Sequence, residues 1–335
     1  MIKIGIIGMG YWGPNLYRNF DLSKDFFVKY VCDRDLKVLK KISLSNEFTS
    51  KVNNYKKIIN DSDIQAVVIA TPVSTHYSLA KECLEAGKHV FVEKPLADSS
   101  KKCQSLINIA KKNSLTLFVD HTFLYTSAVN KMKEIASKKD FGNLLYYDST
   151  RINLGLIQND INVMWDLAVH DLAILNFIEN RKPKIVSAVG HKHFKSKPIT
   201  SAYLTIKYDN NFVAHINVNW LSPVKIRQTI LGGSKKMILY NDLEPSDKIK
   251  VFNKGVDVIK NENSPSNLVE YKVGDTFLPN LKNIEALKTA VLEFKKMIHN
   301  KKYKSRSTGQ NGMDVVKILE AADKSMANNG RPVKA

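Results

Sequence analysis

The amino-acid sequence predicts an α/β protein of two domains: an N-terminal doubly wound parallel sheet, and a C-terminal α+β domain with a large, mainly antiparallel sheet. Short apolar runs alternate with helical patterns up to residue 121, which is typical of parallel strands joined by crossover helices. Beyond that point apolar residues recur at every second position in several segments, which indicates half-buried antiparallel strands. A length of 335 residues accommodates two domains. We therefore expect domains at 1–121 and 122–335.

The composition is typical of a soluble globular protein, with 44% apolar and 25% charged residues. No apolar run approaches the roughly 20 residues that cross a bilayer, so we expect no association with a membrane. The chain enters its first apolar strand directly, without the pattern of a signal peptide, and its cysteines lack the spacing of a metal site. We interpret Cys32, Cys83 and Cys103 as buried thiols of a cytoplasmic protein.

The net charge of +19 raises the question of nucleic-acid binding. The lysines, however, occur in ones and twos and are not interleaved with aromatic residues, as they are on surfaces that bind single strands. We therefore predict no nucleic-acid partner and interpret the charge as a lysine-rich solvated surface. Attraction of a small anionic substrate is the alternative explanation.

The stretch Lys3–Gly13 carries the first functional motif. An apolar strand pattern leads into Gly8-x-Gly10-x-x-Gly13, and a helical stretch follows. In a dinucleotide-binding turn the first glycine permits the tight turn, the second lets a diphosphate approach the backbone, and the third lets the helix pack on the strand. The N–H groups at the helix N-terminus then face the anion. We predict a Rossmann domain in which the loop residues Gly8, Gly10, Tyr11, Trp12 and Gly13 bind the cofactor.

A second strand pattern, Phe26–Cys32, is followed by Asp33, about 20 residues after Gly13. A dinucleotide-binding unit places here the carboxylate that accepts hydrogen bonds from the adenosine ribose. A carboxylate at this point repels a 2′-phosphate and favours NAD over NADP, although Arg34 beside it can stack on adenine or soften that preference. The alternative is that Asp33 caps a helix at Leu36–Ile42.

Two further motifs follow later strands, on the edge where open α/β sheets bind ligands. Thr71-Pro72 comes after the apolar run Ala66–Ala70, and Glu93-Lys94-Pro95 comes after His89–Val92. Pro95 favours an extended backbone at Lys94. An ammonium group there favours the alkoxide of a reacting carbinol, whereas the alternative is a solvated lysine in a turn. With Asp33 and Arg34, the cofactor site is predicted to include Thr71, Pro72, His76, Glu93 and Lys94.

Three motifs taken together, Gly8-Met-Gly-Tyr-Trp-Gly13, Ala70-Thr-Pro72 and Glu93-Lys-Pro95, resemble in order and spacing the glucose-fructose oxidoreductase / inositol dehydrogenase / rhizopine catabolism (Gfo/Idh/MocA) family. The resemblance runs over nearly the whole chain. The stretches Gly10-Tyr-Trp-Gly-Pro-Asn15 and Gly232-Gly-Ser-Lys-Lys-Met237 are similar to a subgroup of surface-polysaccharide sugar-nucleotide dehydrogenases. The resemblance implies NAD(P)-dependent oxidation of a CH–OH group, and a homodimer or homotetramer formed through the C-terminal sheet.

Asp166 and His170 stand at positions i and i+4 of a helical pattern that continues to Ile178. At this spacing the two side chains share a helix face, and a carboxylate behind an imidazole fixes its tautomer and raises its pKa. Taken alone, such a pair is more often a solvated surface pair. The family motif has an acid and a histidine here, so the resemblance implies that Asp166 and His170 join Lys94 as catalytic residues. Asp171, which projects about 100° away, ranks as a helper.

The other histidines lack the spacing of metal ligands, so we predict no metal. His121 follows the last parallel strand pattern, which ends at Val119, and is expected to line the substrate cleft. The predicted substrate-binding residues are Lys94, His121, Arg151, Asp166 and His170.

The C-terminal half is predicted to contain a hairpin, Ser201–Tyr208 and Phe212–Trp220, around the turn Asp209-Asn-Asn211. An apolar sheet face this broad needs covering by helices or by another subunit. Further strands are expected near Lys225–Leu231, Lys236–Tyr240 and Ile249–Phe252, an exposed loop at Asn261–Asn267, and helices at Ile284–His299 and Gly312–Met326.

These inferences converge on an NAD-dependent dehydrogenase that oxidises a secondary alcohol of a sugar held between the two domains. His170 would accept the hydroxyl proton, Asp166 would orient His170, and Lys94 would stabilise the alkoxide; whether Lys94 or His170 is the immediate base stays open. The subgroup resemblance implies a nucleotide-linked sugar, such as a UDP-N-acetylhexosaminuronate oxidised at C3. The alternatives are a free sugar or inositol and, in another class, a non-catalytic NAD-binding regulator, which would not need all three residues.

Overall fold

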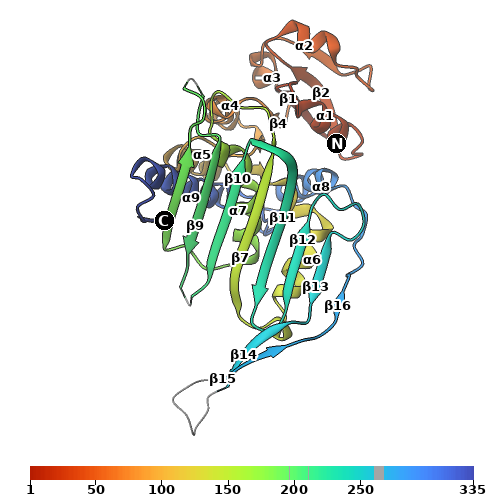
Figure 1. The fold of residues 1–335 in the computed structure, drawn as a ribbon. Helices are drawn as coiled ribbons and strands as arrows, with labels where there is room; N and C mark the ends of the chain where they lie inside the picture. The colour runs from red at the N-terminus through yellow and green to blue at the C-terminus, as the bar shows by residue number, and fades with distance from the viewer. Residues whose placement is uncertain (196, 210, 260–267) are drawn as a thin grey trace. The chain divides into compact units, whose positions relative to one another are not determined.

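The computed structural model describes residues 1–335 except 196, 210 and 260–267 (Figure 1). The chain divides into two compact units. Unit 1 comprises Met1–Tyr125 and Ile284–Lys317, and unit 2 comprises Thr126–Asn283 and Ile318–Ala335. A division at residues 121 and 122 assigns everything after that point to the second domain, whereas in the structure a late segment returns to unit 1.

Unit 1 is built on a six-stranded parallel sheet with the strand order β3-β2-β1-β4-β5-β6. The order reverses between β1 and β4, so the carboxyl ends of these strands form a switch point of the kind at which open α/β sheets bind ligands. The predicted doubly wound parallel sheet is confirmed. Its strands are β1 (Ile2–Ile7), β2 (Phe26–Cys32), β3 (Ser50–Val52), β4 (Ala66–Ile69), β5 (His89–Glu93) and β6 (Leu117–Asp120).

The helices of unit 1 begin where the chain offers capping groups. The Ser99 side chain accepts a hydrogen bond from the backbone N–H of Lys102 at the start of one helix, and Pro14 occupies the first turn of another. The predicted buried state of the three cysteines is confirmed. The helices are α1 (Gly13–Asp21), α2 (Leu36–Lys41), α3 (Lys56–Asn60), α4 (Val73–Glu85), α5 (Ser100–Lys112), η1 (Thr122–Tyr125) and α8 (Ala286–His299).

An aromatic cluster explains why α8 belongs to unit 1. The Phe294 ring is fully buried, and its centroid lies 5.5 Å from that of Phe91 and 5.8 Å from that of Phe118. Phe20 and Phe26 complete the cluster at 6.4 and 6.1 Å from Phe294. Edge-to-face and offset aromatic pairs each add about 0.5–1.5 kcal/mol beyond the burial of their area. The late segment is therefore held to β5 and β6 by apolar packing.

Unit 2 is built on a nine-stranded sheet with the order β16-β13-β12-β11-β7-β10-β9-β8-β17. β7 and β10 run parallel, and the other described pairs are antiparallel, as predicted for a mainly antiparallel sheet. The strands are β7 (Leu144–Leu154), β8 (Ile185–His191), β9 (Ser201–Lys207), β10 (Val213–Asn219), β11 (Leu221–Gly233), β12 (Met237–Asn241), β13 (Ile249–Phe252), β16 (Thr276–Phe277) and β17 (Val333–Lys334).

The predicted hairpin is confirmed as the antiparallel pair of β9 and β10, in which Ile216 faces Leu204. On β10 the side chains alternate: Ala214, Ile216 and Val218 are buried, whereas His215 is exposed. The predicted exposed loop Asn261–Asn267 lies outside the described residues. A separate two-stranded sheet consists of β14 (Gly255–Ile259) and β15 (Leu268–Lys272).

Helices cover one face of the nine-stranded sheet. In Figure 1 its strands face the viewer, with α6 and α7 behind them. The residues buried on β10 therefore form the core with these helices, and the opposite face carries exposed side chains. The helical elements are α6 (Ser127–Ala136), η2 (Lys139–Phe141), η3 (Met164–Ala168), α7 (Val169–Ile178) and α9 (Gly309–Ala327), the last of which starts in unit 1.

Candidate functional site

The glycine loop between β1 and α1 has the backbone geometry of a diphosphate cradle. Gly8 has a φ of +96°, and a Cβ there would lie 2.6 Å from the carbonyl oxygen of Ala70. A Cβ on Gly13 would lie 2.2 Å from the Gly8 carbonyl oxygen, so neither position accepts a side chain. Around a Cβ placed on Gly10 no described atom lies within 4 Å, so the backbone there is open to a ligand. The loop therefore fits the diphosphate of a dinucleotide.

Asp33 ties the end of β2 to this loop. Its Oδ2 accepts a hydrogen bond from the Met9 N–H at 2.9 Å, and its Oδ1 accepts one from the Asp35 N–H at 2.9 Å. The helix-cap alternative is wrong, because the N-cap of α2 is Asp35, whose side chain accepts from the Lys37 N–H. Each oxygen of Asp33 keeps a second lone pair, so the carboxylate can also accept ribose hydroxyls.

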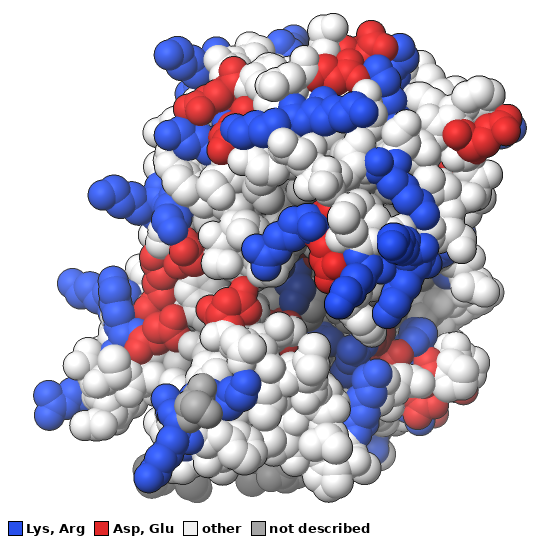
Figure 2. Space-filling view, turned by 90° about the horizontal axis from the view of Figure 1, so that it is seen from above, with Lys and Arg blue, Asp and Glu red and all other residues white. Residues whose placement is uncertain are grey.

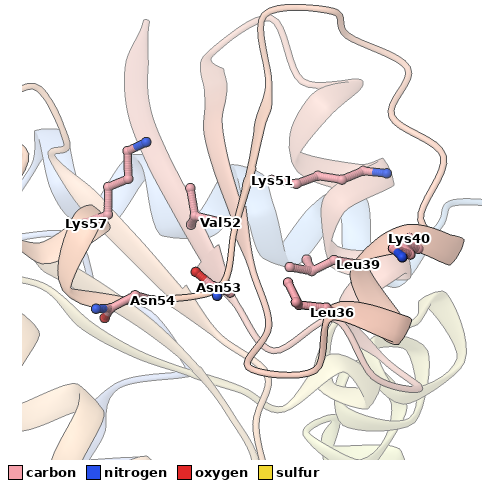
Figure 3. Close-up of a pocket in the computed structure, with 8 residues that line it drawn as sticks. All are labelled: Leu36, Leu39, Lys40, Lys51, Val52, Asn53, Asn54 and Lys57. Atoms are coloured by element: carbon pink, nitrogen blue, oxygen red, sulfur yellow. The ribbon is translucent and has the colours of Figure 1, made fainter.

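A pocket of about 620 Å³ lies at the carboxyl ends of β2 and β3 (Figure 3). The Asp33 N–H donates to the Val52 carbonyl at 3.3 Å, so the pocket adjoins the proposed ribose site. The ammonium of Lys51 is tied to the Ile42 carbonyl at 2.6 Å. Three lysines that line the pocket, Lys40, Lys51 and Lys57, place positive charge beside the proposed ribose site and bear on the choice between NAD and NADP. The pocket is lined by Leu36, Leu39, Lys40, Lys51, Val52, Asn53, Asn54 and Lys57.

His76 joins two loops at the carboxyl edge of the sheet. Its Nδ1 lies 2.8 Å from the Pro95 carbonyl oxygen, and its Nε2 lies 2.8 Å from the Thr71 carbonyl oxygen. The ring is 1% exposed. The nitrogen that carries the proton donates to one of these carbonyls. The structure thus places His76 as a brace between Thr71-Pro72 and the Glu93-Lys94-Pro95 turn, whose Lys94–Pro95 peptide is cis.

Glu93 and Asp120 form a carboxyl pair beside Lys94, in which Asp120 is buried and Glu93 is half-buried with its Oε1 atom shielded from solvent. They end the neighbouring parallel strands β5 and β6, where they are register partners. Burial, followed by the negative charge of Asp120, raises the pKa of Glu93 well above its ordinary value. Burial raises the pKa of Asp120 to about 6, and the Thr122 hydroxyl, which donates to Asp120 Oδ1 at 2.9 Å, acts against that rise. The field of Lys94 lowers both pKa values.

Two further polar rings belong to the same cluster. His121 is 2% exposed, and burial, then the charge of Lys94, lowers its pKa to about 4, so the ring is neutral at physiological pH. Within the described chain, neither ring nitrogen of His121 has a hydrogen-bond partner. The Trp12 side chain acts on Asp120, whose pKa it lowers. Tyr11, by contrast, is 95% exposed. The cluster offers donors and acceptors at the carboxyl ends of β1, β5 and β6.

Sequence reasoning included Glu93 and His121 but missed Asp120. The signal was present, because Asp120 immediately follows the apolar run that was predicted as the last parallel strand. Glu93 ends the strand before it in the chain, and consecutive strands of such a sheet are usually neighbours. Two carboxylates at neighbouring strand ends therefore indicate a pair.

In unit 2, Asp166 and His170 lie where a π-helical turn, η3, meets α7. Both side chains are half-buried. Asp166 Oδ2 accepts a hydrogen bond from the Trp220 indole at 3.0 Å, and Trp220 is 1% exposed. The shared-face argument assumed α-helical spacing, whereas a π-turn holds more residues per turn. The catalytic roles of Asp166 and His170 stay predictions, and the Trp220 bond is a feature that spacing did not indicate.

Arg151 and Asp171 form an ion pair in the interior of unit 2. Arg151 Nε donates to Asp171 Oδ2 at 2.7 Å and Nη2 donates to Oδ1 at 3.1 Å, with 3% and 1% of the side chains exposed. The Ser149 hydroxyl donates to Asp171 Oδ1 at 2.8 Å. Asp171, ranked above as a catalytic helper, is thus engaged in structure, and the predicted contact of Arg151 with substrate stays a prediction.

The residues that the structure describes include no group of three or more histidine, cysteine or acidic residues able to hold a metal ion. Nor is any helix in that part of the chain long and apolar enough to span a membrane. In Figure 2, Lys and Arg side chains form several small groups with Asp and Glu between them, as expected for scattered lysines.

The fold and the glycine loop of unit 1 define the class of protein: an oxidoreductase with an NAD-binding Rossmann domain. Residues 2–121 match the family model of the GFO_IDH_MocA oxidoreductases with an NAD-binding Rossmann fold, and residues 129–239 match the GFO/IDH/MocA C-terminal domain. The chain belongs to this family. The resemblance inferred from the motifs, and NAD as cofactor, are confirmed.

Two curated relatives are similar to about half of the chain. An uncharacterized oxidoreductase of Streptococcus pneumoniae is 24% identical over 57% of this chain, and UDP-N-acetylglucosamine 3-dehydrogenase of Acidithiobacillus ferrooxidans is 29% identical over 46% of it. The matched part of the chain spans about half the length of these relatives, 53% and 48%. Among solved structures, GenD2 from gentamicin A biosynthesis, in complex with NAD, has a TM-score of 0.83 at 18% identity and covers 100% of this chain and 96% of its own.

Proposed function

We propose that the protein is an NAD-dependent dehydrogenase that oxidises a secondary alcohol of a sugar. The observation that carries the proposal is the position of Lys94. It follows β5 directly, on the same sheet edge as the glycine loop that follows β1. A cation thus stands on the edge that binds the hydride acceptor, where it can favour the alkoxide from which hydride leaves.

The chain's own residues have these roles in the proposal. The glycine loop holds the cofactor diphosphate and Asp33 the adenosine ribose, and bound NAD supplies the hydride acceptor. From unit 2, His170 accepts the hydroxyl proton, and Asp166 orients His170. The Trp220 indole in turn fixes one oxygen of Asp166. Lys94 stabilises the negative charge that develops on the substrate oxygen.

We further propose that the substrate is a nucleotide-linked sugar, such as a UDP-N-acetylhexosaminuronate oxidised at C3. Two observations support this. One curated relative acts on a UDP-sugar at C3 by name, and the motifs resemble the subgroup of surface-polysaccharide enzymes. The net charge of +19 also suits an anionic diphosphate, because a positive field raises the local concentration of such a ligand.

The test is NADH formation against a panel of UDP-sugars, free sugars and polyols. We expect turnover on the UDP-linked uronates. Turnover on inositol or free sugars alone would contradict the proposed substrate but support the proposed reaction. No turnover on any member, with tight NAD binding retained, would contradict the proposal and favour the non-catalytic regulator.

We also propose that the open face of the nine-stranded sheet forms a homo-oligomer interface. Tyr203 and Val189, opposite each other on β9 and β8, are each 64% exposed, and Ile230 is 37% exposed on β11. Exposed apolar patches on a broad face are typical of interaction sites. Sedimentation of the wild type and of Tyr203→Glu tests this: we expect a dimer or tetramer that the variant dissociates. A monomeric wild type would contradict it.

A further inference from the structure

Glu93 and Asp120 are two acids at the carboxyl ends of neighbouring strands. They are register partners on adjacent strands, and neighbouring strands lie about 4.8 Å apart. Asp120 is 1% exposed. In the part of the chain that is described, Glu93 Oε1 and Asp120 Oδ2 are both shielded from solvent, and neither accepts a hydrogen bond of ordinary geometry. Each strand end thus directs one carboxyl oxygen into the same region, where the two side chains interact with each other.

Two ionised carboxylates this close in a dry site are unfavourable, and one proton between them removes most of the cost. The surrounding charged and titratable groups agree with a single negative charge. Lys94, next to Glu93 in the chain, supplies one positive charge, and the buried His121 is neutral. His76 contacts backbone carbonyls of the neighbouring loops. The Thr122 hydroxyl donates to Asp120 Oδ1, which leaves the other oxygen for the shared proton.

We propose that Glu93 and Asp120 hold one proton in common, and that the singly charged pair acts as a positioning device that orients the Lys94 ammonium toward the substrate oxygen. With one proton the pair and Lys94 sum to zero charge. With a second proton the pair is neutral and no longer offers a negative charge to the ammonium. With none, an uncompensated negative charge remains in the site and opposes the alkoxide.

The consequence for catalysis rests on the proposed dehydrogenase function, whereas the shared proton does not. As the pH falls, the pair takes up its second proton and activity falls with it. Burial raises the pKa values of both acids, so this loss occurs at a higher pH than it would for a single, ordinary carboxylate. A shared proton therefore leaves two signatures: one in the resting protein and one in the pH profile.

The resting signature is read by infrared spectroscopy at neutral pH, with NAD bound and in H₂O and D₂O. We expect the wild type to show a carbonyl band of one protonated carboxyl group. Both Asp120→Asn and Glu93→Gln should lose it, because the remaining acid then ionises beside Lys94. Asp323→Asn is the matched control: burial raises the pKa of Asp323 too, but Trp165 and Asn162 donate to it, and the band should stay.

A wild type without the band overturns the proposal. So does a band that survives in Asp120→Asn or in Glu93→Gln, because that marks an acid protonated by itself. NAD affinity of each variant, measured by titration, reports whether it is folded. If one variant fails to bind NAD, the other still decides between these outcomes.

The catalytic signature is the acid limb of the pH profile, that is, the fall of kcat/KM for the sugar as the pH is lowered. In Asp120→Asn the limb should move to lower pH by about one unit or more, with NAD affinity unchanged. A merely structural role would lower turnover at all pH values and leave the limb in place, which would contradict positioning by the pair. No turnover in the wild type, with the infrared result intact, would refute the proposed function and leave the shared proton standing.

Discussion

The two units differ in how the side chains of the proposed site are placed. In unit 1 the relevant residues follow strand ends: the glycine loop follows β1, Asp33 follows β2, and Lys94 follows β5. In unit 2 Asp166 lies in a π-helical turn and is held by Trp220, 54 residues later in the chain. Parallel strands bring their carboxyl ends to one edge whatever the loops contain. Antiparallel strands impose no such common edge, so tertiary contacts position the residues of unit 2.

The largest effect is expected at the strand-end cation. Lys94→Met should lower kcat/KM for the sugar by about 10³-fold, the upper end of the 10²–10³ that electrostatic groups aimed at a developing oxyanion are typically worth. NAD affinity should change little. Lys101→Met, an exposed lysine on α5, is the control and should keep wild-type rates. Near-normal turnover in Lys94→Met would contradict a catalytic role for Lys94.

His170→Asn tests the contribution of unit 2. A general base contributes about 10²–10⁴-fold, so kcat should fall by a factor in that range. The fall of kcat at low pH, which protonation of the base causes, should also disappear. If the pH limb survives in His170→Asn and vanishes in Lys94→Met, Lys94 is the immediate base instead. His299→Asn, an exposed histidine at the end of α8, is the matched control.

Asp171→Asn separates structure from chemistry in unit 2. Removing one partner of a buried ion pair typically destabilises by about 3–5 kcal/mol, because the guanidinium of Arg151 is left uncompensated. Urea unfolding should show this loss, whereas Glu134→Gln, which removes two surface ion pairs, should not change the midpoint measurably. An unchanged midpoint in Asp171→Asn would mean that the pair is not a stabilising element.

Trp220→Phe tests whether the indole hydrogen bond to Asp166 contributes to turnover. The substitution keeps an aromatic ring and removes the hydrogen bond to Asp166, so we expect kcat to fall about tenfold, equivalent to about 1.4 kcal/mol. Trp165→Phe is a matched control, because its indole also donates to a carboxylate of unit 2, Asp323, at 2.7 Å. Equal losses in both variants would indicate general destabilisation rather than positioning of Asp166.

The smallest effect is expected in cofactor choice. Asp33→Asn removes the charge that repels a 2′-phosphate and should shift the NAD-to-NADP preference by about tenfold toward NADP, roughly 1.4 kcal/mol. The nearby lysines, Lys51 and Lys57, favour the same shift. Binding titrations with both cofactors measure it. A preference that does not move would place the discrimination elsewhere than at Asp33.

What the sequence predicted follows the same division. The doubly wound sheet, the glycine loop and the position of Lys94 could be predicted because each depends on local pattern and on the common edge of a parallel sheet. The sequence pattern could not predict that Asp35, rather than Asp33, caps α2. Both acids stand just before this helix, and only the hydrogen-bond geometry distinguishes their roles.

Long-range contacts account for the rest. Phe294 packs in unit 1 against Phe20 and Phe26, which lie more than two hundred positions earlier in the chain. The periodicity of α8 does not identify these partners. The π-turn at Met164–Ala168 has the same apolar spacing signal as an ordinary helix. The hydrogen bond from Trp220 to Asp166 depends on a long-range contact and on the π-turn, since it joins a residue next to β10 to that turn.

The central claim is that this chain transfers hydride from a sugar carbon to NAD, and isotope transfer tests it most directly. A UDP-N-acetylhexosaminuronate carrying deuterium at C3 is incubated with the protein and NAD, and the reduced cofactor is analysed by mass spectrometry. The account predicts one deuterium in the NADH that forms. NAD bound tightly with no deuterium transferred, from this or any other labelled sugar alcohol, would contradict it.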